Sequence, residues 1–301
     1  MIPIHLLILL VCVFYFGPVP AQYYFYNDHY YDSPVLVELS ASGGLMNCLT
    51  DLGGKQKKAT FFFNEVNWEY TKPHGTMLFG IVFHQKAGIR FSGTYGTVFA
   101  SDGILQGIGP PAQYRYQRNL HFQSRIIECS FLADIYPLAF FQQGPKWSPY
   151  CSAGIGMIKF DPKAIWQNQW VRLHPLRTEG QGFKQYPDRI PYRLNSLSFP
   201  LAGGIRFEPG ALSALRLEIA YRFLDTDYLD DVSTDYPAQS SFALNLSPGL
   251  AEPARNLSFR KPELNGALAA VEGEQRGNPG KRDAFFTISI QFALVLNRKK
   301  V

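Results

Sequence analysis

Hydrophobic and polar positions alternate with a period of two residues in several segments of this chain. In residues 213–224, for example, Leu215 and Leu217 alternate with Arg216 and Glu218. Successive side chains of a β-strand point to opposite faces, so the pattern predicts strands with one apolar face and one polar or small face.

Eight segments of this kind are predicted, and the connections between them alternate between long and short. Short periplasmic turns, long external loops and an even number of strands are typical of bacterial outer-membrane barrels. We therefore predict an all-β fold, an up-and-down, eight-stranded antiparallel transmembrane β-barrel with long extracellular loops and both termini in the periplasm. The predicted strands are residues 35–47, 75–84, 86–98, 121–136, 148–158, 195–207, 213–224 and 284–296.

The distribution of charge separates a membrane barrel from a soluble barrel of the lipocalin kind. A soluble barrel turns its apolar face inward, and its wet outer face carries charge. Here one face of each strand is nearly free of charge, which favours a transmembrane barrel. The other face collects four acids and four arginines: Glu38, Arg90, Glu128, Asp134, Arg206, Arg216, Glu218 and Arg222.

These eight charged residues are predicted to form an ion-pair network inside the barrel. Eight strands enclose a lumen that side chains just fill, and an unpaired buried charge is costly. A balanced set of acids and arginines can fill the lumen and can also give each buried charge a partner of opposite sign. The sequence therefore predicts a filled barrel with no open pore and no path for a small-molecule substrate.

Composition and charge narrow the class of protein further. The 301 residues are 46% apolar and 15% aromatic, and only 18% are charged. After the N-terminal region no segment offers 18 consecutive apolar residues, which excludes a helical membrane protein. The formal net charge is +5, and the basic residues behind it are scattered along the chain. Without a basic stripe, nucleic-acid binding is not expected.

The N-terminal residues resemble a signal peptide. Leu6–Phe16 is an unbroken apolar run that is too short to span a bilayer as a helix. Small residues before Gln22 suit cleavage, although the segment before the apolar run has no Lys or Arg. We predict a signal peptide over residues 1–21 and a barrel domain over residues 22–301. Cys48, Cys129 and Cys151 then remain, an odd number that leaves at least one thiol unpaired.

Candidate catalytic and metal chemistry is sparse. No Gly-x-Ser-x-Gly motif accompanies the histidines, so no catalytic residue and no cofactor site is predicted. The stretch Asp225–Asp235 holds five aspartates, and clustered carboxylates suit Ca²⁺. The spacing lacks the glycine and the final glutamate of an EF-hand loop. Pairing of these carboxylates with Arg177, Arg189 or Arg276 is the expected arrangement, and no metal site is assigned.

One predicted periplasmic turn is long and aromatic. Residues 137–148 place Phe140, Phe141 and Trp147 at the expected periplasmic rim. Exposed aromatic side chains mark interaction sites, so these residues are candidates for partner contact. An ordinary aromatic girdle at the membrane interface is the alternative.

Several motifs, taken in order, resemble the PorG-like outer-membrane barrels of the Bacteroidetes type IX secretion system. They are Arg118-Asn119-Leu120, SPYCSAGIG followed by FDPKA, LHPLRTEGQG, TDYLDDVST and GEQRGNPGKRDAFF. The resemblance covers nearly all of the predicted mature chain. The basic stretch Lys55, Lys57 and Lys58, and the basic tail beyond Phe292, depart from it.

The resemblance implies a protein that is not an enzyme. It implies a barrel in the outer-membrane bilayer that tethers a periplasmic ring to that membrane, through which cargo is exported. The ring is built from subunits of the PorK and PorN kind. Two other functions stay open: an OmpA-like structural or adhesion barrel without a secretion role, and a lipid-modifying outer-membrane enzyme.

Overall fold

A computed structural model of the protein describes residues 30–31, 34–53, 68–107, 109, 112–141, 147–265 and 271–300. The predicted signal peptide over residues 1–21 and the basic stretch Lys55–Lys58 lie outside these described residues. In the described part, Cys48, Cys129 and Cys151 are all free thiols. No described helix is long and apolar enough to cross a membrane.

Eight antiparallel strands form a closed barrel in which each strand pairs with its neighbours along the chain. The order β4-β3-β2-β11-β10-β9-β6-β5 closes through the pairing of β4 with β5. The prediction of an eight-stranded antiparallel barrel is therefore confirmed. The strands are β2 (Val35–Leu49), β3 (Lys72–Phe83), β4 (Ala87–Ser101), β5 (His121–Ile135), β6 (Trp147–Lys159), β9 (Asn195–Gly210), β10 (Ser213–Leu224) and β11 (Ala284–Val295).

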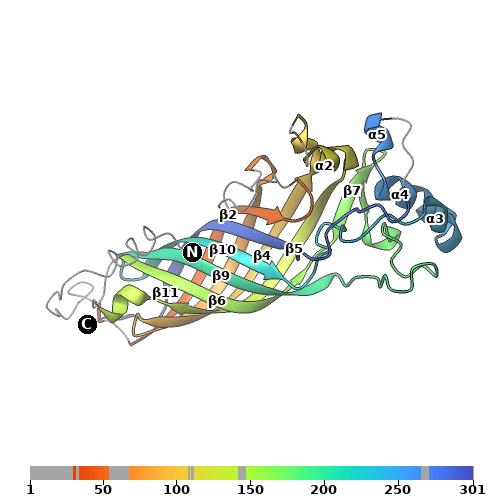
Figure 1. Ribbon diagram of the computed structural model, residues 1–301. Helices are drawn as coiled ribbons and strands as arrows, with labels where there is room; N and C mark the ends of the chain where they lie inside the picture. The colour runs from red at the N-terminus through yellow and green to blue at the C-terminus, as the bar shows by residue number, and fades with distance from the viewer. Residues whose placement is uncertain are drawn as a thin grey trace, which may run out of the picture.

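The connections give the barrel two different ends. Residues 84–86, 136–146 and 211–212 join strands at one end, which we call the short-turn end. Residues 50–71, 102–120, 160–194 and 225–283 join strands at the other, the long-loop end. Figure 1 shows helices α2 to α5 gathered at the long-loop end, with the C-terminus at the opposite end of the barrel.

The long loops contain structure that period-two alternation did not predict. A hairpin of β7 (Pro162–Trp166) and β8 (Gln169–Arg172) continues the sheet beyond β5. Its turn places Gln167 and Asn168 at positive φ, as two-residue hairpin turns require. The remaining elements are β1 (Tyr30–Tyr31), η2 (Trp68–Tyr70), η3 (Asp102–Leu105), α2 (Ala112–Arg118), η4 (Pro137–Phe140), η5 (His174–Leu176), α3 (Gln239–Asn245), α4 (Pro248–Ser258), α5 (Pro262–Asn265) and β12 (Lys299–Lys300).

The polarity of the barrel wall is inverted relative to a soluble protein. Large apolar side chains point outward from all eight strands; Met77 is 62% exposed and Ile290 is 66% exposed. The alternate positions carry charged, hydroxyl and small side chains that are buried in the lumen. A wall of this polarity is stable where hydrocarbon surrounds it, and barrel closure leaves no unpaired strand edge in the lipid.

Candidate functional site

The structure places all eight sequence-predicted charged residues in the lumen, each at most 9% exposed. Six of them are joined in one continuous chain of ion pairs. The chain runs through the following pairs: Arg206 Nη2 to Glu38 Oε1 at 2.5 Å, Glu38 Oε2 to Arg216 Nη2 at 2.7 Å, Arg216 Nη1 to Asp134 Oδ2 at 3.1 Å, Asp134 Oδ2 to Arg90 Nε at 2.8 Å, and Arg90 Nη2 to Glu218 Oε2 at 2.7 Å.

Arg216 is central to this chain, because its guanidinium bridges Glu38 and Asp134 and is fully buried. The guanidinium also lies over the rings of Tyr136 and Tyr150, at 5.9 and 5.3 Å from their centroids. Electrostatic attraction to an aromatic face adds to the ion pairs at a desolvated site. The hydroxyl of Tyr150 donates to Glu218 at 2.8 Å, so the rings also take part in the polar network.

Glu128 and Arg222 form a separate pair nearer the long-loop end. Arg222 Nε lies 3.1 Å from Glu128 Oε2, and the hydroxyl of Ser198 donates to Glu128 Oε1 at 2.8 Å. Arg222 Nη1 also donates to Thr287 Oγ1 and to the backbone carbonyl of Ala220. Each charge of this pair therefore has a partner of opposite sign and a neutral hydrogen-bond partner.

The ion-pair chain extends to two residues that the sequence analysis missed. Glu208 pairs with Arg206, and Arg298 Nη2 lies 2.8 Å from Glu208 Oε2. The extended chain then holds four arginines and four acids and is electrically balanced. Glu208 continues the inward alternation of Arg206, so a longer predicted strand would have included it. Arg298 lies beyond the last predicted strand, where alternation gives no signal.

Apolar clusters lie toward both ends of the barrel interior. At the short-turn end the cluster consists of Leu36, Val82, Tyr136, Ala139, Tyr150 and Val295. At the long-loop end a larger cluster includes Phe122, Phe160, Phe183, Phe242 and Phe285. It is continuous with side chains of the loops, and Leu229 and Leu257 belong to it. Charged and apolar side chains thus share the interior of the barrel, as expected for eight strands whose lumen side chains fill.

The sequence motifs in the long loops meet at one buried carboxylate, Glu179 of LHPLRTEGQG. It accepts hydrogen bonds from the backbone amides of Ser233 and Thr234 at 2.9 and 3.0 Å, both within TDYLDDVST. It also accepts from Arg276 Nη1 of GEQRGNPGKRDAFF at 2.9 Å. Three segments far apart in sequence are therefore tied to one side chain.

Glycines in these motifs are required by close approach and by backbone conformation. Gly180 has φ +73°, and a Cβ there would lie 2.7 Å from the ring of Tyr186. A Cβ on Gly277 would lie 2.6 Å from the backbone nitrogen of Ser233. Both contacts are too short for a larger residue: a side-chain ring packs on Gly180 and a backbone segment packs on Gly277, so the motifs have a structural role.

The aspartates of Asp225–Asp235 are partly paired as the sequence analysis expected. Asp231 Oδ2 lies 3.8 Å from Arg276 Nη2, and Tyr192 donates to Asp231 Oδ1 at 2.6 Å. Asp225 instead pairs with Arg282. Arg189 donates to the backbone carbonyl of Asp235 rather than to a carboxylate, and no described contact joins Arg177 to these aspartates.

Burial raises the pKa of several carboxyls in this loop. The pKa of Asp231 rises to about 6 in spite of Arg276, and that of Asp227 rises to about 7, with nearby Asp51 adding to the effect. Burial also raises the pKa values of Asp230 and Asp283, with nearby Asp51 adding to the effect on Asp230 and Asp230 adding to the effect on Asp283. Within the described residues, no three His, Cys, Asp or Glu side chains are positioned to hold a metal ion.

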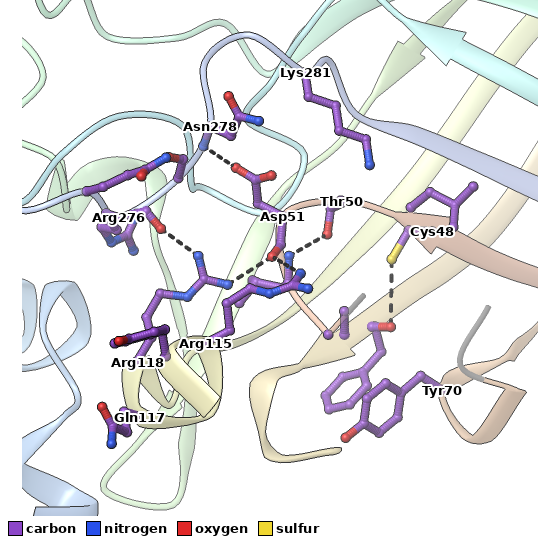
Figure 2. A pocket seen from close by; sticks show the side chains of 18 of the residues that line it. Cys48, Thr50, Asp51, Tyr70, Arg115, Gln117, Arg118, Arg276, Asn278 and Lys281 are labelled. Carbon is purple, nitrogen blue, oxygen red and sulfur yellow. Dashed lines mark hydrogen bonds between the residues drawn. The ribbon is translucent and has the colours of Figure 1, made fainter. Parts of the chain in front are cut away.

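A cavity opens at the long-loop end beside these motifs (Figure 2). It has a volume of about 430 Å³ and lies between the residues that follow β2, helix α2 and the loop that precedes β11. Arg118, the first residue of the Arg-Asn-Leu motif, lines it. Its Nη1 and Nη2 donate to the backbone carbonyls of Arg276 and Asp51 at 2.5 and 2.9 Å.

The three aromatic residues predicted for partner contact lie at the short-turn end and are exposed. Phe140 is 58% exposed, Phe141 69% and Trp147 59%. Lys86 Nζ lies 5.6 Å from the centroid of the Phe140 ring, and Trp147 stacks on Phe207 with centroids 4.3 Å apart. The surface is therefore aromatic, with one lysine beside the Phe140 ring.

Comparison with known proteins shows similarity of fold alone. No family model and no curated protein matches the chain. Among solved structures, the Yersinia pestis attachment invasion locus protein Ail, bound to a heparin analogue, is 8% identical; the alignment covers 87% of this chain and 97% of Ail, with a TM-score of 0.35. Neisserial surface protein A is also 8% identical, over 88% and 98%, with a TM-score of 0.35. The N-terminal β-barrel domain of Pseudomonas aeruginosa OprF is 8% identical, over 87% and 97%, with a TM-score of 0.33.

Proposed function

We propose that this protein is a non-enzymatic outer-membrane scaffold, and that it tethers a periplasmic ring of the type IX secretion machinery to the membrane. The observation that carries the scaffold role is the filled lumen. Eight buried charged side chains form an electrically balanced chain of ion pairs, and apolar clusters lie toward both ends of the barrel. Such an interior supplies rigidity and leaves the two ends of the barrel as the surfaces for function.

The short-turn end supports the tethering role, and we place it in the periplasm. Barrels of this kind carry their short turns on the periplasmic side. Phe140, Phe141 and Trp147 are exposed there, with Lys86 beside the Phe140 ring. Clustered aromatic side chains are typical of the centres of protein interfaces. We propose that ring subunits of the PorK and PorN kind dock on this surface.

Co-purification from mild detergent tests the proposal. The full-length protein carries an affinity tag at a long-loop position and is isolated from its native host. We expect the ring subunits to be recovered with the unaltered protein and lost with the double substitution Phe140→Ser/Phe141→Ser. Tyr114→Ser is the matched control, because Tyr114 is 72% exposed at the opposite end.

Two results would contradict different parts of the proposal. Recovery of the barrel without any ring subunit contradicts the secretion role and favours a plain OmpA-like barrel. Equal recovery of ring subunits with the double variant contradicts docking at these phenylalanines, and they then belong to an aromatic girdle at the membrane interface.

A further inference from the structure

The outward face of the barrel wall carries two charged side chains, and they are neighbours. Arg125 of β5 and Lys159 of β6 occupy outward positions, and both are exposed. Within the part of the chain that the structure describes, no other Lys, Arg, Asp or Glu takes an outward position on the eight barrel strands. Lys159 lies opposite Ile127 in the β5–β6 ladder, and Arg125 is the next outward residue of β5 beyond Ile127. Diagonal neighbours of this kind are within reach of each other's long side chains.

The protein itself does not neutralise these two charges. Arg125 and Lys159 make no ion pair and no side-chain hydrogen bond among the residues that the structure describes. The charged residues predicted for the lumen differ in this respect, because each of them is paired with a residue of opposite sign. The guanidinium of Arg125 and the ammonium group of Lys159 are therefore available to an anion from the surroundings of the barrel.

The length of the strands places both groups at the edge of the hydrocarbon on the long-loop side. A tilted strand crosses the hydrocarbon core in about 9–11 residues. Counted from the short-turn end, the segments 125–135 of β5 and 149–159 of β6 have this length. The next outward residues toward the short-turn end, Ile127 and Met157, are 46% and 59% exposed and face the lipid. A basic side chain on the lipid face costs little near the interface and much more at the midplane, so this depth suits contact with lipid headgroups.

The basic surface continues onto the β7–β8 hairpin, which Figure 1 shows beside β5 at the long-loop end. Lys163 of β7 lies opposite Gln123 of β5 and opposite Arg172 of β8. Asp161 is the acid of this surface; its Oδ1 lies 2.9 Å from Arg172 Nε and its Oδ2 lies 4.0 Å from Lys163 Nζ. Together with Arg125 and Lys159, four basic side chains stand against one carboxylate, a net charge of +3. Arg172 holds the carboxylate of Asp161, so Arg125 and Lys159 are the unpaired members.

Charge and depth together indicate the chemistry of the ligand. Arginine and lysine side chains bind phosphate through charge-assisted hydrogen bonds. The outer leaflet of a bacterial outer membrane is built from lipid A, whose headgroup carries phosphate monoesters. A phosphate monoester carries a charge of about −1.5 to −2 at pH 7. It matches a surface of net charge +3 better than the single charge of a phospholipid diester does. Below the charges, the exposed side chains of Tyr95, Ile127 and Met157 offer apolar surface to acyl chains.

We propose that Arg125 and Lys159 bind a phosphate group of lipid A, and that acyl chains of the same molecule lie along the barrel wall below them. Lys163 and Arg172 add to the positive potential that attracts the headgroup. The site rests on the proposed placement of the long-loop end outside the cell, and it does not depend on the ring contact at the short-turn end. It is a binding site, and no chemical step on the lipid is proposed.

Native mass spectrometry of the full-length barrel in detergent tests the site, because it counts the lipid molecules that stay bound to each protein. The probe is lipid A with two phosphate groups, titrated to give an apparent affinity. We expect Arg125→Gln and Lys159→Gln each to weaken binding about fivefold, and the double variant to weaken it about thirtyfold. Lipid A from which both phosphates have been removed is expected to bind the unaltered protein about thirtyfold more weakly, since the same contact is then lost from the other side.

A matched control variant and a second anionic lipid complete the experiment. Lys184→Gln/Arg255→Gln removes two exposed basic side chains of the long loops and is expected to leave the affinity unchanged. The gel mobility of unheated samples confirms that every variant is folded. Phosphatidylglycerol, a phosphodiester lipid, is expected to bind the unaltered protein about fivefold more weakly than lipid A or weaker still.

Three results would overturn the proposal. They are equal binding of lipid A with and without its phosphates, binding of phosphatidylglycerol as tight as that of lipid A, and a double variant Arg125→Gln/Lys159→Gln that binds lipid A as well as the control variant does. The ring contact is measured by co-purification and this site by lipid binding, so the two proposals fail separately.

Discussion

The pair of Glu128 and Arg222 allows a direct test of how the lumen is stabilised. Substitution Arg222→Met removes the guanidinium that lies 3.1 Å from Glu128 Oε2. It leaves a fully buried carboxylate whose remaining donor, among the residues that the structure describes, is the Ser198 hydroxyl. Removing one partner of a buried ion pair costs about 3–5 kcal/mol of stability, because the remaining charge stays desolvated without compensation.

The double variant Glu128→Gln/Arg222→Met separates lost charge pairing from lost packing. It removes both charges and keeps side chains of similar length, so no charge is left buried and alone. Replacing a whole buried pair is often close to neutral. We therefore expect the double variant to regain more than half of the stability that Arg222→Met loses.

Urea titration of the refolded barrel in lipid vesicles measures these differences. Tryptophan fluorescence and the gel mobility of unheated samples report the folded fraction, and the free energy of unfolding is compared among the three proteins. The reasoning about an unpaired buried charge is refuted by either of two results. One is a free energy of unfolding for Arg222→Met within about 1 kcal/mol of that of the unaltered protein. The other is a double variant that is less stable than Arg222→Met.

Three other predictions follow from the described contacts. The purified protein is expected to show no stable channel in planar bilayers, since ion pairs and two apolar clusters fill the lumen; a reproducible conductance step would contradict this. The raised pKa values of Asp227 and Asp231, about 7 and about 6, mean that the folded loops bind protons that the unfolded loops release. Loop stability should therefore increase as pH falls from 8 to 5, measured by hydrogen exchange corrected for intrinsic rates, and Asp227→Asn should reduce that increase. Gly277→Ala is expected to expose the long loops to protease while the barrel fragment stays intact, because its Cβ would lie 2.6 Å from the backbone nitrogen of Ser233; Gly249→Ala, with open space around its Cβ, is the control.

Alternation along the chain was sufficient to predict the barrel because each strand has one face in the lumen and one outside. The predicted segment 213–224 matches β10 (Ser213–Leu224), and Arg216 and Leu217 point to the faces that alternation assigned. Prediction was least complete at strand ends. The segment 195–207 stops short of Gly210, so Glu208 and its partner Arg298 were missed.

The long loops were beyond this kind of reasoning. Their motifs were recognisable, but nothing in the sequence places Glu179 within hydrogen-bonding distance of Ser233 and Arg276. Helix α3 (Gln239–Asn245) and the β7–β8 hairpin are too short for a periodic pattern to stand out. Their positions depend on contacts with distant loops.

The sequence by itself thus determined the number of strands, their alternation of faces and the identity of eight of the charges inside. Those features depend on local backbone geometry, in which neighbouring side chains take opposite sides. Only the tertiary structure decided which acid meets which arginine, how the motifs converge on Glu179, and that a cavity opens beside them. These features depend on contacts between residues far apart in the chain, and only closure of the barrel brings those residues together.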